Sequence, residues 1–152
     1  MSSKSVFFAL LFLSSLGYNV VGQDSALTLK KEKYNINKIG EDQIGYSQAV
    51  KVGNTIYVSG SVGWGNMDDA LKLVYDEIDK TLKNYNASFA NVVKENLYST
   101  ALDSVIKYKD IRRKYYGDDF PAATWIEVKR LYDPGLVVEV EVIAVIPDEK
   151  IQ

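Results

Sequence analysis

The sequence predicts a single α+β domain, in which a mixed sheet carries two helices on one face. Its length of 152 residues suits one domain. β-rich runs precede, separate and follow two amphipathic helical segments, a pattern typical of an α+β fold. A hydrophobic content of 47% and a charged content of 25% are ordinary for a globular protein that folds on its own core.

The first half of the chain supplies a hairpin and a helix. Residues 27–34 fit either a lysine-rich edge strand or a leader to the domain. Residues 46–61 hold two β-rich runs around Gly53-Asn54, a typical hairpin turn. Alternation places Ile56 and Val58 on one face of the second run, and the opposite face then holds Thr55, Tyr57, Ser59 and Ser61. A helix should follow from Asn66 or Asp68 to about Tyr85, with an apolar stripe of Leu71, Val74, Tyr75, Ile78 and Leu82.

The second half predicts a strand, a helix and a final hairpin. Residues 92–101 alternate as a strand, and a second helix is expected from Asp103 or Ser104 to Tyr116, where Gly117 ends it. Ile111 and Tyr115 should face inward, and the solvent-facing side should carry Lys107, Lys109, Arg112, Arg113 and Lys114. Residues 123–131 and 136–146 then form two strands joined by Asp133-Pro134-Gly135. With both helices on one face, the other face needs a partner subunit, so we expect an oligomer.

The composition excludes several chemistries. The chain has no cysteine and no histidine, which removes disulfides, thiol nucleophiles, Cys/His zinc sites and histidine bases. Eighteen basic residues face twenty acidic ones, so there is no excess of positive charge of the kind that binds nucleic acid.

Residues 1–22 have the layout of a secretory signal peptide. Lys4 precedes an apolar run from Val6 to Leu13, and Val20 and Gly22 permit cleavage before Gln23. The run is shorter than the roughly 20 residues of a membrane span. We therefore expect a mature domain of residues 23–152 that is secreted or periplasmic and has no stable membrane insertion. An uncleaved anchor or a buried first helix is the alternative.

Two local patterns could carry chemistry. Glu139 and Glu141 share one face of the last strand. Burial of one of them would raise its pKa and suit it to acid–base work, whereas a half-exposed strand would simply leave both solvated. In the second pattern, Ser59-Gly60-Ser61, glycine allows close approach of a ligand, or marks only a bend or bulge.

Taken together, several segments resemble the Rid (reactive intermediate deaminase, or YjgF) family. The segments "IGYSQAVKVGNTIYVSG" and "FPAATWIEVKRL…VVEVEVIAV" are similar to its two signature ends, and the resemblance spans about residues 44–147. It implies a chorismate-mutase-like fold and a homotrimer with small-molecule sites between subunits. It also implies hydrolysis of enamines and imines without metal or organic cofactor.

The resemblance assigns roles to particular positions. It makes Glu139 the acid that positions water, Tyr46 a pocket residue, and Ser59-Gly60 the strand end that lines the cleft. The segment Pro121-Ala122-Ala123-Thr124 departs from the family pattern, because deaminating members carry arginine where this chain has Ala123. That arginine binds the substrate carboxylate through two parallel hydrogen bonds. Trp125, on the same side as Ala123, would narrow the cleft or make it aromatic.

Two functions therefore stay open. One is a Rid-like hydrolase with altered specificity, in which Tyr46, Trp64 and Trp125 shape an apolar pocket for an imine without an essential carboxylate. The other is a non-catalytic trimer that binds a small ligand or a protein. An endoribonuclease activity is disfavoured by the net charge and the missing histidine.

Overall fold

The structure, a computed structural model, describes residues 29–147, and the predicted signal peptide lies outside these residues. Six strands form one mixed sheet in the order β1-β2-β3-β6-β4-β5, in which only the β4–β5 pair is parallel among the described strands. The strands are β1 (Glu32–Tyr34), β2 (Ala49–Val52), β3 (Thr55–Trp64), β4 (Val92–Ser99), β5 (Ala122–Glu127) and β6 (Leu136–Val145). The helices are α1 (Lys38–Ile44), α2 (Met67–Lys83), α3 (Leu102–Lys107) and α4 (Asp110–Tyr116), with a 3-10 turn at Phe89–Asn91.

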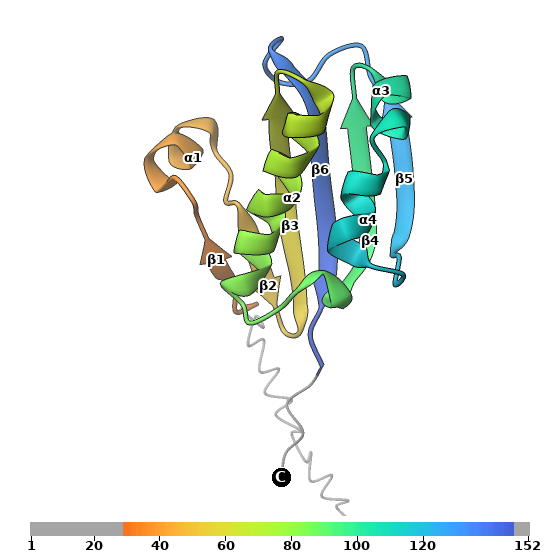
Figure 1. The fold of residues 1–152 in the computed structure, drawn as a ribbon. Helices are drawn as coiled ribbons and strands as arrows, with labels where there is room; N and C mark the ends of the chain where they lie inside the picture. Colours follow the sequence, from red (N-terminus) through yellow and green to blue (C-terminus); the bar gives the residue numbers. More distant parts are fainter. Residues whose placement is uncertain (1–28, 148–152) are drawn as a thin grey trace, which may run out of the picture.

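The helices α2, α3 and α4 cover one face of the sheet, as predicted (Figure 1). The stripe expected on α2 is buried, and it packs on β3 and β6. Gly63 of β3 allows the close approach, since a Cβ there would lie 2.6 Å from the backbone oxygen of Ala70. The opposite face of the sheet has no covering layer among the described residues, and Tyr57 on it is 51% exposed.

The alternation predicted for residues 46–61 holds only as far as Val58. The hairpin turns at Gly53-Asn54, and Ile56 and Val58 are buried against the helices. A β-bulge follows, because Val58 pairs with Val142 and Ser61 with Val140, which leaves one extra residue on β3. Ser61 is consequently buried on the helix side, so the face predicted for it was wrong.

The second predicted helix is two helices. Tyr108 leaves the helical conformation (φ −105°, ψ 17°), which ends α3, and α4 begins at Asp110. The break lets α3 pack on β4 and β5 while α4 packs on α2. Gly117 ends α4, as predicted.

Arg112 does not face solvent as predicted. Its side chain is 11% exposed, and its Nε donates a hydrogen bond of 2.8 Å to Glu95 of β4. The other four basic residues of this segment are exposed as expected. Arg112 lies inward because the buried Glu95 carboxylate needs a cationic partner.

The ends of the sheet are shorter than predicted. Within residues 29–34 the predicted first strand is confined to β1 at Glu32–Tyr34, and β5 ends at Glu127 rather than at 131. Helix α1 is an element that the sequence patterns did not predict. In the described residues no helix is long and apolar enough to cross a membrane.

Candidate functional site

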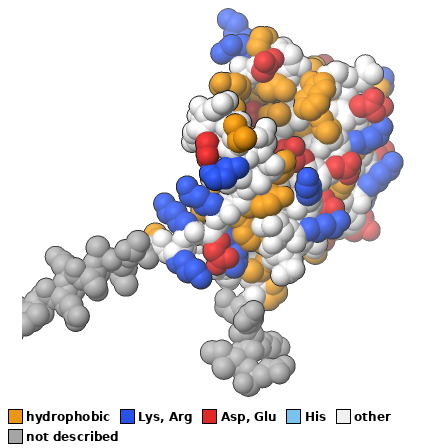
Figure 2. Space-filling view, turned by 90° about the vertical axis from the view of Figure 1, so that its left-hand side faces the viewer, with side chains coloured by type: hydrophobic (Ala, Val, Ile, Leu, Met, Phe, Trp, Pro, Cys, Tyr) orange, Lys and Arg blue, Asp and Glu red, His pale blue; other side chains and the backbone are white. Residues whose placement is uncertain are grey.

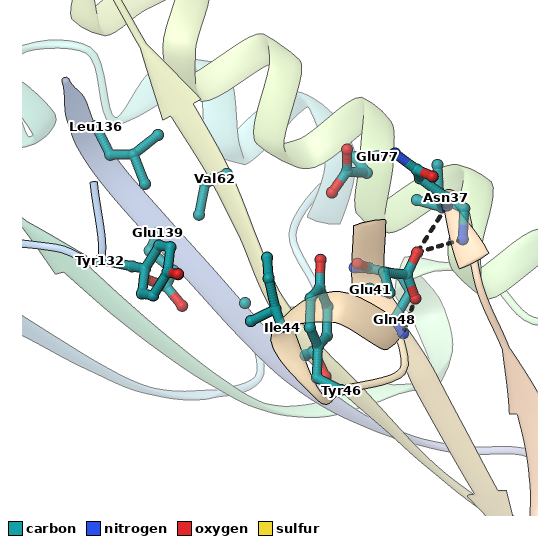
Figure 3. A pocket seen from close by; sticks show the side chains of 13 residues that line it. Asn37, Glu41, Ile44, Tyr46, Gln48, Val62, Glu77, Tyr132, Leu136 and Glu139 are labelled. Atoms are coloured by element: carbon teal, nitrogen blue, oxygen red, sulfur yellow. Dashed lines mark hydrogen bonds between the residues drawn. The ribbon is translucent and has the colours of Figure 1, made fainter. Parts of the chain in front are cut away.

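A cavity of about 470 Å³ lies beside the β3 bulge. Its walls come from α1 and the segments flanking it, from α2, β3 and β6, and from the loop before β6 (Figure 3). Four predicted site residues line it: Tyr46, Ser59, Gly60 and Glu139. These residues come together because Ser59 and Gly60 lie in the bulge of β3, Glu139 lies on the neighbouring strand β6, and Tyr46 shortly precedes β2. On the α1 side of the molecule, hydrophobic side chains gather between charged ones (Figure 2), and Ile39 and Ile44 of α1 are exposed there.

Glu139 is the central carboxylate of this cavity. Within residues 29–147, the Glu139 carboxylate has no hydrogen-bond or ion-pair partner that would stabilise its negative charge. Gly60 lies directly against the Glu139 side chain. A Cβ on residue 60 would stand 2.7 Å from the Glu139 Cγ and closer still to its carboxylate. Glycine at position 60 is therefore what leaves space for Glu139 on the neighbouring strand.

Glu139 and Glu141 share one face of β6, as predicted, but their surroundings differ. The Glu141 carboxylate accepts hydrogen bonds from Asn96 Nδ2 at 2.8 Å and from the Tyr98 hydroxyl at 3.2 Å. Burial, and secondly the charge of Glu141, raise the pKa of Glu139 above its ordinary value. Glu139 is thus the member of the pair better suited to taking up and releasing a proton.

Tyr46 stands where several negative charges converge. Its side chain is 40% exposed and lines the cavity. Burial raises the pKa of its hydroxyl, and the charges of Glu41, Glu77 and Glu139 raise it further. The phenol therefore stays protonated and can donate a hydrogen bond to a ligand in the cavity.

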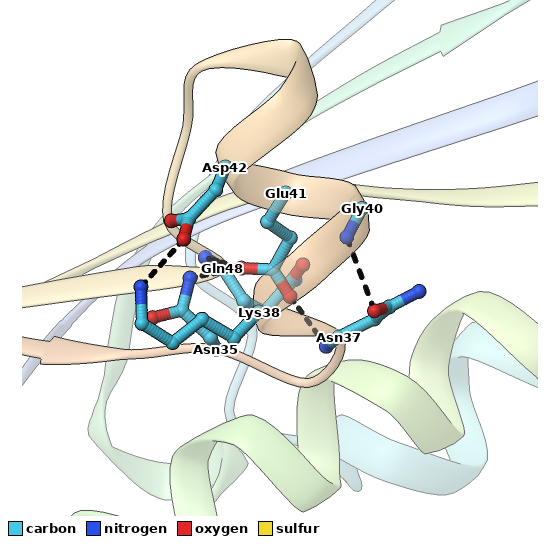
Figure 4. Close-up of polar contacts among 7 residues, drawn as sticks. All are labelled: Asn35, Asn37, Lys38, Gly40, Glu41, Asp42 and Gln48. Atoms are coloured by element: carbon cyan, nitrogen blue, oxygen red, sulfur yellow. Dashed lines mark hydrogen bonds and ion pairs between the residues drawn. The ribbon is translucent and has the colours of Figure 1, made fainter.

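Glu41 fixes the wall that carries Tyr46. Its carboxylate accepts hydrogen bonds from the backbone N–H groups of Ile36, Asn37 and Gln48 at 2.7–2.8 Å, and from the side chain of Asn35 (Figure 4). Burial opposes ionisation of Glu41, but these four hydrogen bonds outweigh it and hold its pKa below the ordinary value. This element has no periodic apolar pattern in the sequence. Its caps could have indicated α1, because the Asn37 side chain accepts from the Gly40 N–H and Gly45 ends the helix at φ 97°.

The other predicted site residues lie at the far edge of the sheet. Ala123, Thr124 and Trp125 belong to β5, which β4 separates from β6. Ala123 and Trp125 lie beside Glu95 and Leu97 of β4, on the helix side, and Thr124 accepts a hydrogen bond from Lys94 on the open side. Neither they nor Trp64, which is 59% exposed at the end of β3, line the cavity. One chain therefore does not bring the two groups of predicted residues together.

Comparisons with known proteins identify the family. The model of the family described as Endoribonuclease L-PSP matches residues 40–146. This chain belongs to that family, the YjgF or Rid family. A RutC family protein of Pyrococcus abyssi is 33% identical over 108 residues, covering 65% of this chain and 84% of the relative. A 2-iminobutanoate/2-iminopropanoate deaminase of Bos taurus is 33% identical over 109 residues, covering 66% and 79%.

Solved structures of Rid proteins confirm the fold. A Mycobacterium tuberculosis member of the YjgF/YER057c/UK114 family superposes with a TM-score of 0.72 at 26% identity, covering 77% of this chain and 100% of that one. Yeast Mmf1 gives a TM-score of 0.62 at 28% identity, covering 66% and 86%. The α+β fold with helices on one sheet face is thus the Rid fold.

In this Rid protein a buried ionic cluster occupies the region beside Ala123. Glu95 is fully buried, and it accepts hydrogen bonds from Arg112, from Trp125 Nε1 at 3.0 Å and from the Tyr75 hydroxyl at 3.2 Å. The Arg112 guanidinium lies 4.5 Å from the ring centroid of Tyr116 and 5.6 Å from that of Trp125. Sequence analysis missed this cluster, because its members are far apart in the chain and each looked like a surface or strand residue.

The described part of the chain offers no obvious metal centre. Within residues 29–147 there is no group of three or more carboxylate side chains close enough to hold a metal ion. The chemistry available in the cavity is that of carboxylates, a phenol, the Ser59 hydroxyl and backbone groups. Ser59 Oγ itself donates a hydrogen bond of 2.8 Å to the Ser47 carbonyl.

Proposed function

We propose that this protein hydrolyses imines to carbonyl compounds and ammonia, with a specificity that differs from that of deaminases which recognise a carboxylate. Family membership and the resemblance to 2-iminobutanoate/2-iminopropanoate deaminases support the reaction type. The altered specificity is inferred from Ala123, a methyl group where the resemblance places a guanidinium. Losing such a charge-assisted contact costs on the order of 2–4 kcal/mol of binding.

One observation carries the proposal: the Glu139 carboxylate. It faces a cavity large enough for a small molecule, it has no partner among the described residues, and burial raises its pKa. A carboxylate that is costly to keep charged and has free lone pairs can accept a proton from water and return it to another atom.

The reaction needs only such proton transfers. Water adds its oxygen to the imine carbon while Glu139 takes a proton from that water. Glu139 then returns the proton to the nitrogen, which gives a carbinolamine. The hydroxyl proton of the carbinolamine passes through Glu139 to the same nitrogen as the carbon–nitrogen bond breaks and the carbonyl forms. The products are a carbonyl compound and ammonia, so atoms and charge balance without a redox partner. Tyr46 would orient the substrate by donating its hydroxyl proton in a hydrogen bond.

The complete site would lie between two copies of the chain. Rid proteins are typically homotrimeric, and here the cavity and the β5 residues lie apart in a single chain. The open sheet face exposes Tyr57 and Ile126, which association would cover. A second copy that presents its β5 edge to the cavity would bring Trp125 towards Glu139 and Tyr46.

A second candidate is a non-catalytic binding protein of the same fold. It is favoured by the cluster of Glu95, Arg112 and Trp125, which gives the region beside Ala123 a structural role. In that case Glu139 would hold a ligand and would not turn it over.

The test is imine hydrolysis by the purified protein. An amino-acid oxidase supplies the imine of 2-aminobutanoate and an amine oxidase that of butylamine, and the loss of each is followed against its spontaneous hydrolysis. We expect acceleration that Glu139→Gln reduces roughly 10²–10⁴-fold, the usual contribution of a general acid–base group. The matched control is Glu141→Gln, on the same strand face, which should keep most of the activity.

An Ala123→Arg variant separates the two candidates. Activity in the wild type supports the hydrolase. Activity that emerges only with Ala123→Arg favours the binding protein, because the scaffold would then be competent and the natural ligand something else. No activity in either protein would contradict the hydrolase proposal.

A further inference from the structure

The cavity is lined by acidic side chains and, among the described residues, by no lysine or arginine. Glu41, Glu77 and Glu139 contribute carboxylates from α1, α2 and β6 (Figure 3). Glu41 is already satisfied by four hydrogen bonds. Glu77 and Glu139 are the two carboxylates whose charge is available to a ligand.

Glu77 differs from the other acids of its own helix. Asp76 accepts a hydrogen bond of 2.7 Å from the Tyr115 hydroxyl, and Asp79 pairs with Lys83. The Glu77 carboxylate has no such partner within residues 29–147, although its residue is partly buried. A cation in the cavity would find this carboxylate free to pair with it.

The rest of the wall suits an organic cation. Tyr46 and Tyr132 present aromatic rings, and Ile44 and Leu136 present aliphatic surface. The face of an aromatic ring attracts an ammonium or iminium group, and aliphatic side chains accommodate its carbon chain. A carboxylate would instead meet two unpaired negative charges.

The two arginines of α4 beside β5 are already paired with carboxylates. Arg112 forms an ion pair of 2.8 Å with the fully buried Glu95, and Arg113 forms one of 2.9 Å with Asp118. Ala123, the β5 residue that pairs with Glu95, carries no charge. A second copy that brings this edge to the cavity therefore adds no unpaired guanidinium from α4.

We infer that the cavity selects positively charged imines and amines that lack a carboxylate, and that Glu77 determines this preference. The inference deepens the proposed function, on which it rests for the reaction but not for the binding. It assigns the substrate class to imines formed by oxidation of simple amines, and it gives a role to a residue that the family resemblance does not.

Binding of two matched probes tests the inference directly. Butylammonium and butanoate share a short carbon chain and carry opposite charges, and each is titrated into the full-length protein while the backbone amides of Gly60 and Val62 are followed by NMR. We expect butylammonium to bind at least about tenfold more tightly, as for one partly desolvated charge pair. Added salt should narrow the difference.

Two variants locate the effect. Glu77→Gln should weaken butylammonium binding about three- to tenfold and leave butanoate binding unchanged or improved. Asp79→Asn removes the same charge from the same helix outside the cavity, and it should change neither. Tighter binding of butanoate, or an equal effect of both variants, would overturn the inference.

The hydrolysis assay keeps this inference separate from the proposed function. A higher kcat/KM for the imine of butylamine than for that of 2-aminobutanoate supports both. Selective butylammonium binding without hydrolysis of either imine would contradict the hydrolase proposal. It would still support selection by charge. Faster hydrolysis of the carboxylate-bearing imine would contradict the charge selection and the altered specificity, and would leave only the imine hydrolysis supported.

Discussion

Two carboxylates on neighbouring central strands of this sheet meet opposite environments. Glu139 of β6 faces a cavity without a partner, next to a glycine that makes room for it. Glu95 of β4 is fully buried on the helix side, where a guanidinium, an indole and a phenol each donate to it. Sequence alone presents both as polar residues in alternating strands. An unmatched hydrogen-bonding capacity therefore distinguishes Glu139, the carboxylate proposed to act in the site, from Glu95, whose saturated capacity stabilises the fold.

The largest effect should come from Glu95. Replacing it with alanine leaves Arg112 buried without its counter-ion and should lower the free energy of unfolding by about 3–5 kcal/mol, measured by urea denaturation. Glu139→Gln, in contrast, should leave stability unchanged or raise it slightly at neutral pH. The sign follows from the raised pKa: holding Glu139 ionised above its unfolded pKa costs the folded state free energy, and glutamine removes that cost.

A double variant tests whether the loss in Glu95→Ala comes from the charge of Arg112 that is left without a partner. Glu95→Leu combined with Arg112→Met should recover much of the stability lost in Glu95→Ala, because well-packed apolar side chains replace both charges. If the Glu95 and Glu139 variants lost equal free energy of unfolding, the distinction between the two carboxylates would be contradicted.

A second prediction uses two glycines of β3. A Cβ at Gly60 meets the side chain of Glu139, which can move, whereas one at Gly63 meets the backbone of Ala70, which cannot. Gly60→Ala should therefore displace Glu139 and reduce imine hydrolysis about 10²-fold, with little loss of stability. Gly63→Ala should destabilise by about 1–3 kcal/mol through overpacking.

The readouts are the hydrolysis rate and urea denaturation of both variants. If Gly60→Ala unfolded the protein as much as Gly63→Ala, the close contact with Glu139 would be structural rather than functional.

The sequence predicted the features that repeat along the chain. The α2 stripe and the β6 alternation follow from the periods of helix and strand, so each buried residue supports its neighbours' assignment. The bulge at Ser59-Gly60 adds one residue without changing the composition, so the sequence could not show that Ser61 turns inward. α1 is only seven residues long and has no apolar stripe, so only its caps could indicate it.

The candidate site could be predicted only in part, for a different reason. The resemblance placed Tyr46, Ser59, Gly60 and Glu139 in one cleft, and in the structure they line one cavity where β3 and β6 are hydrogen-bonded neighbours. Strand order places Ala123 and Trp125 at another edge, and periodicity contains no information on strand order. Arg112 looked solvent-exposed because its partner Glu95 lies in a different element.

A third carboxylate offers the finest test of the comparison. Glu41 lines the same cavity as Glu139, yet its lone pairs are taken by Asn35, Ile36, Asn37 and Gln48. If the hydrogen bonds of a carboxylate, rather than its place in the cavity, determine its role, Glu41→Gln should lower stability. Glutamine places an amide N–H₂ against backbone N–H donors, so the free energy of unfolding should fall by about 1–3 kcal/mol at pH 7.

The pH dependence of this loss identifies its cause. Burial raises the pKa of Glu41 but the four hydrogen bonds lower it more, so its ionised form stabilises the folded state above the unfolded pKa of about 4.3. That stability is lost as pH falls through the lower folded pKa. The difference between wild type and Glu41→Gln in urea denaturation should therefore shrink between pH 5 and pH 3. Amide exchange at Ile36, Asn37 and Gln48 should quicken in the variant at pH 7. A difference that stays constant with pH would mean that Glu41 acts through packing and not through its charge.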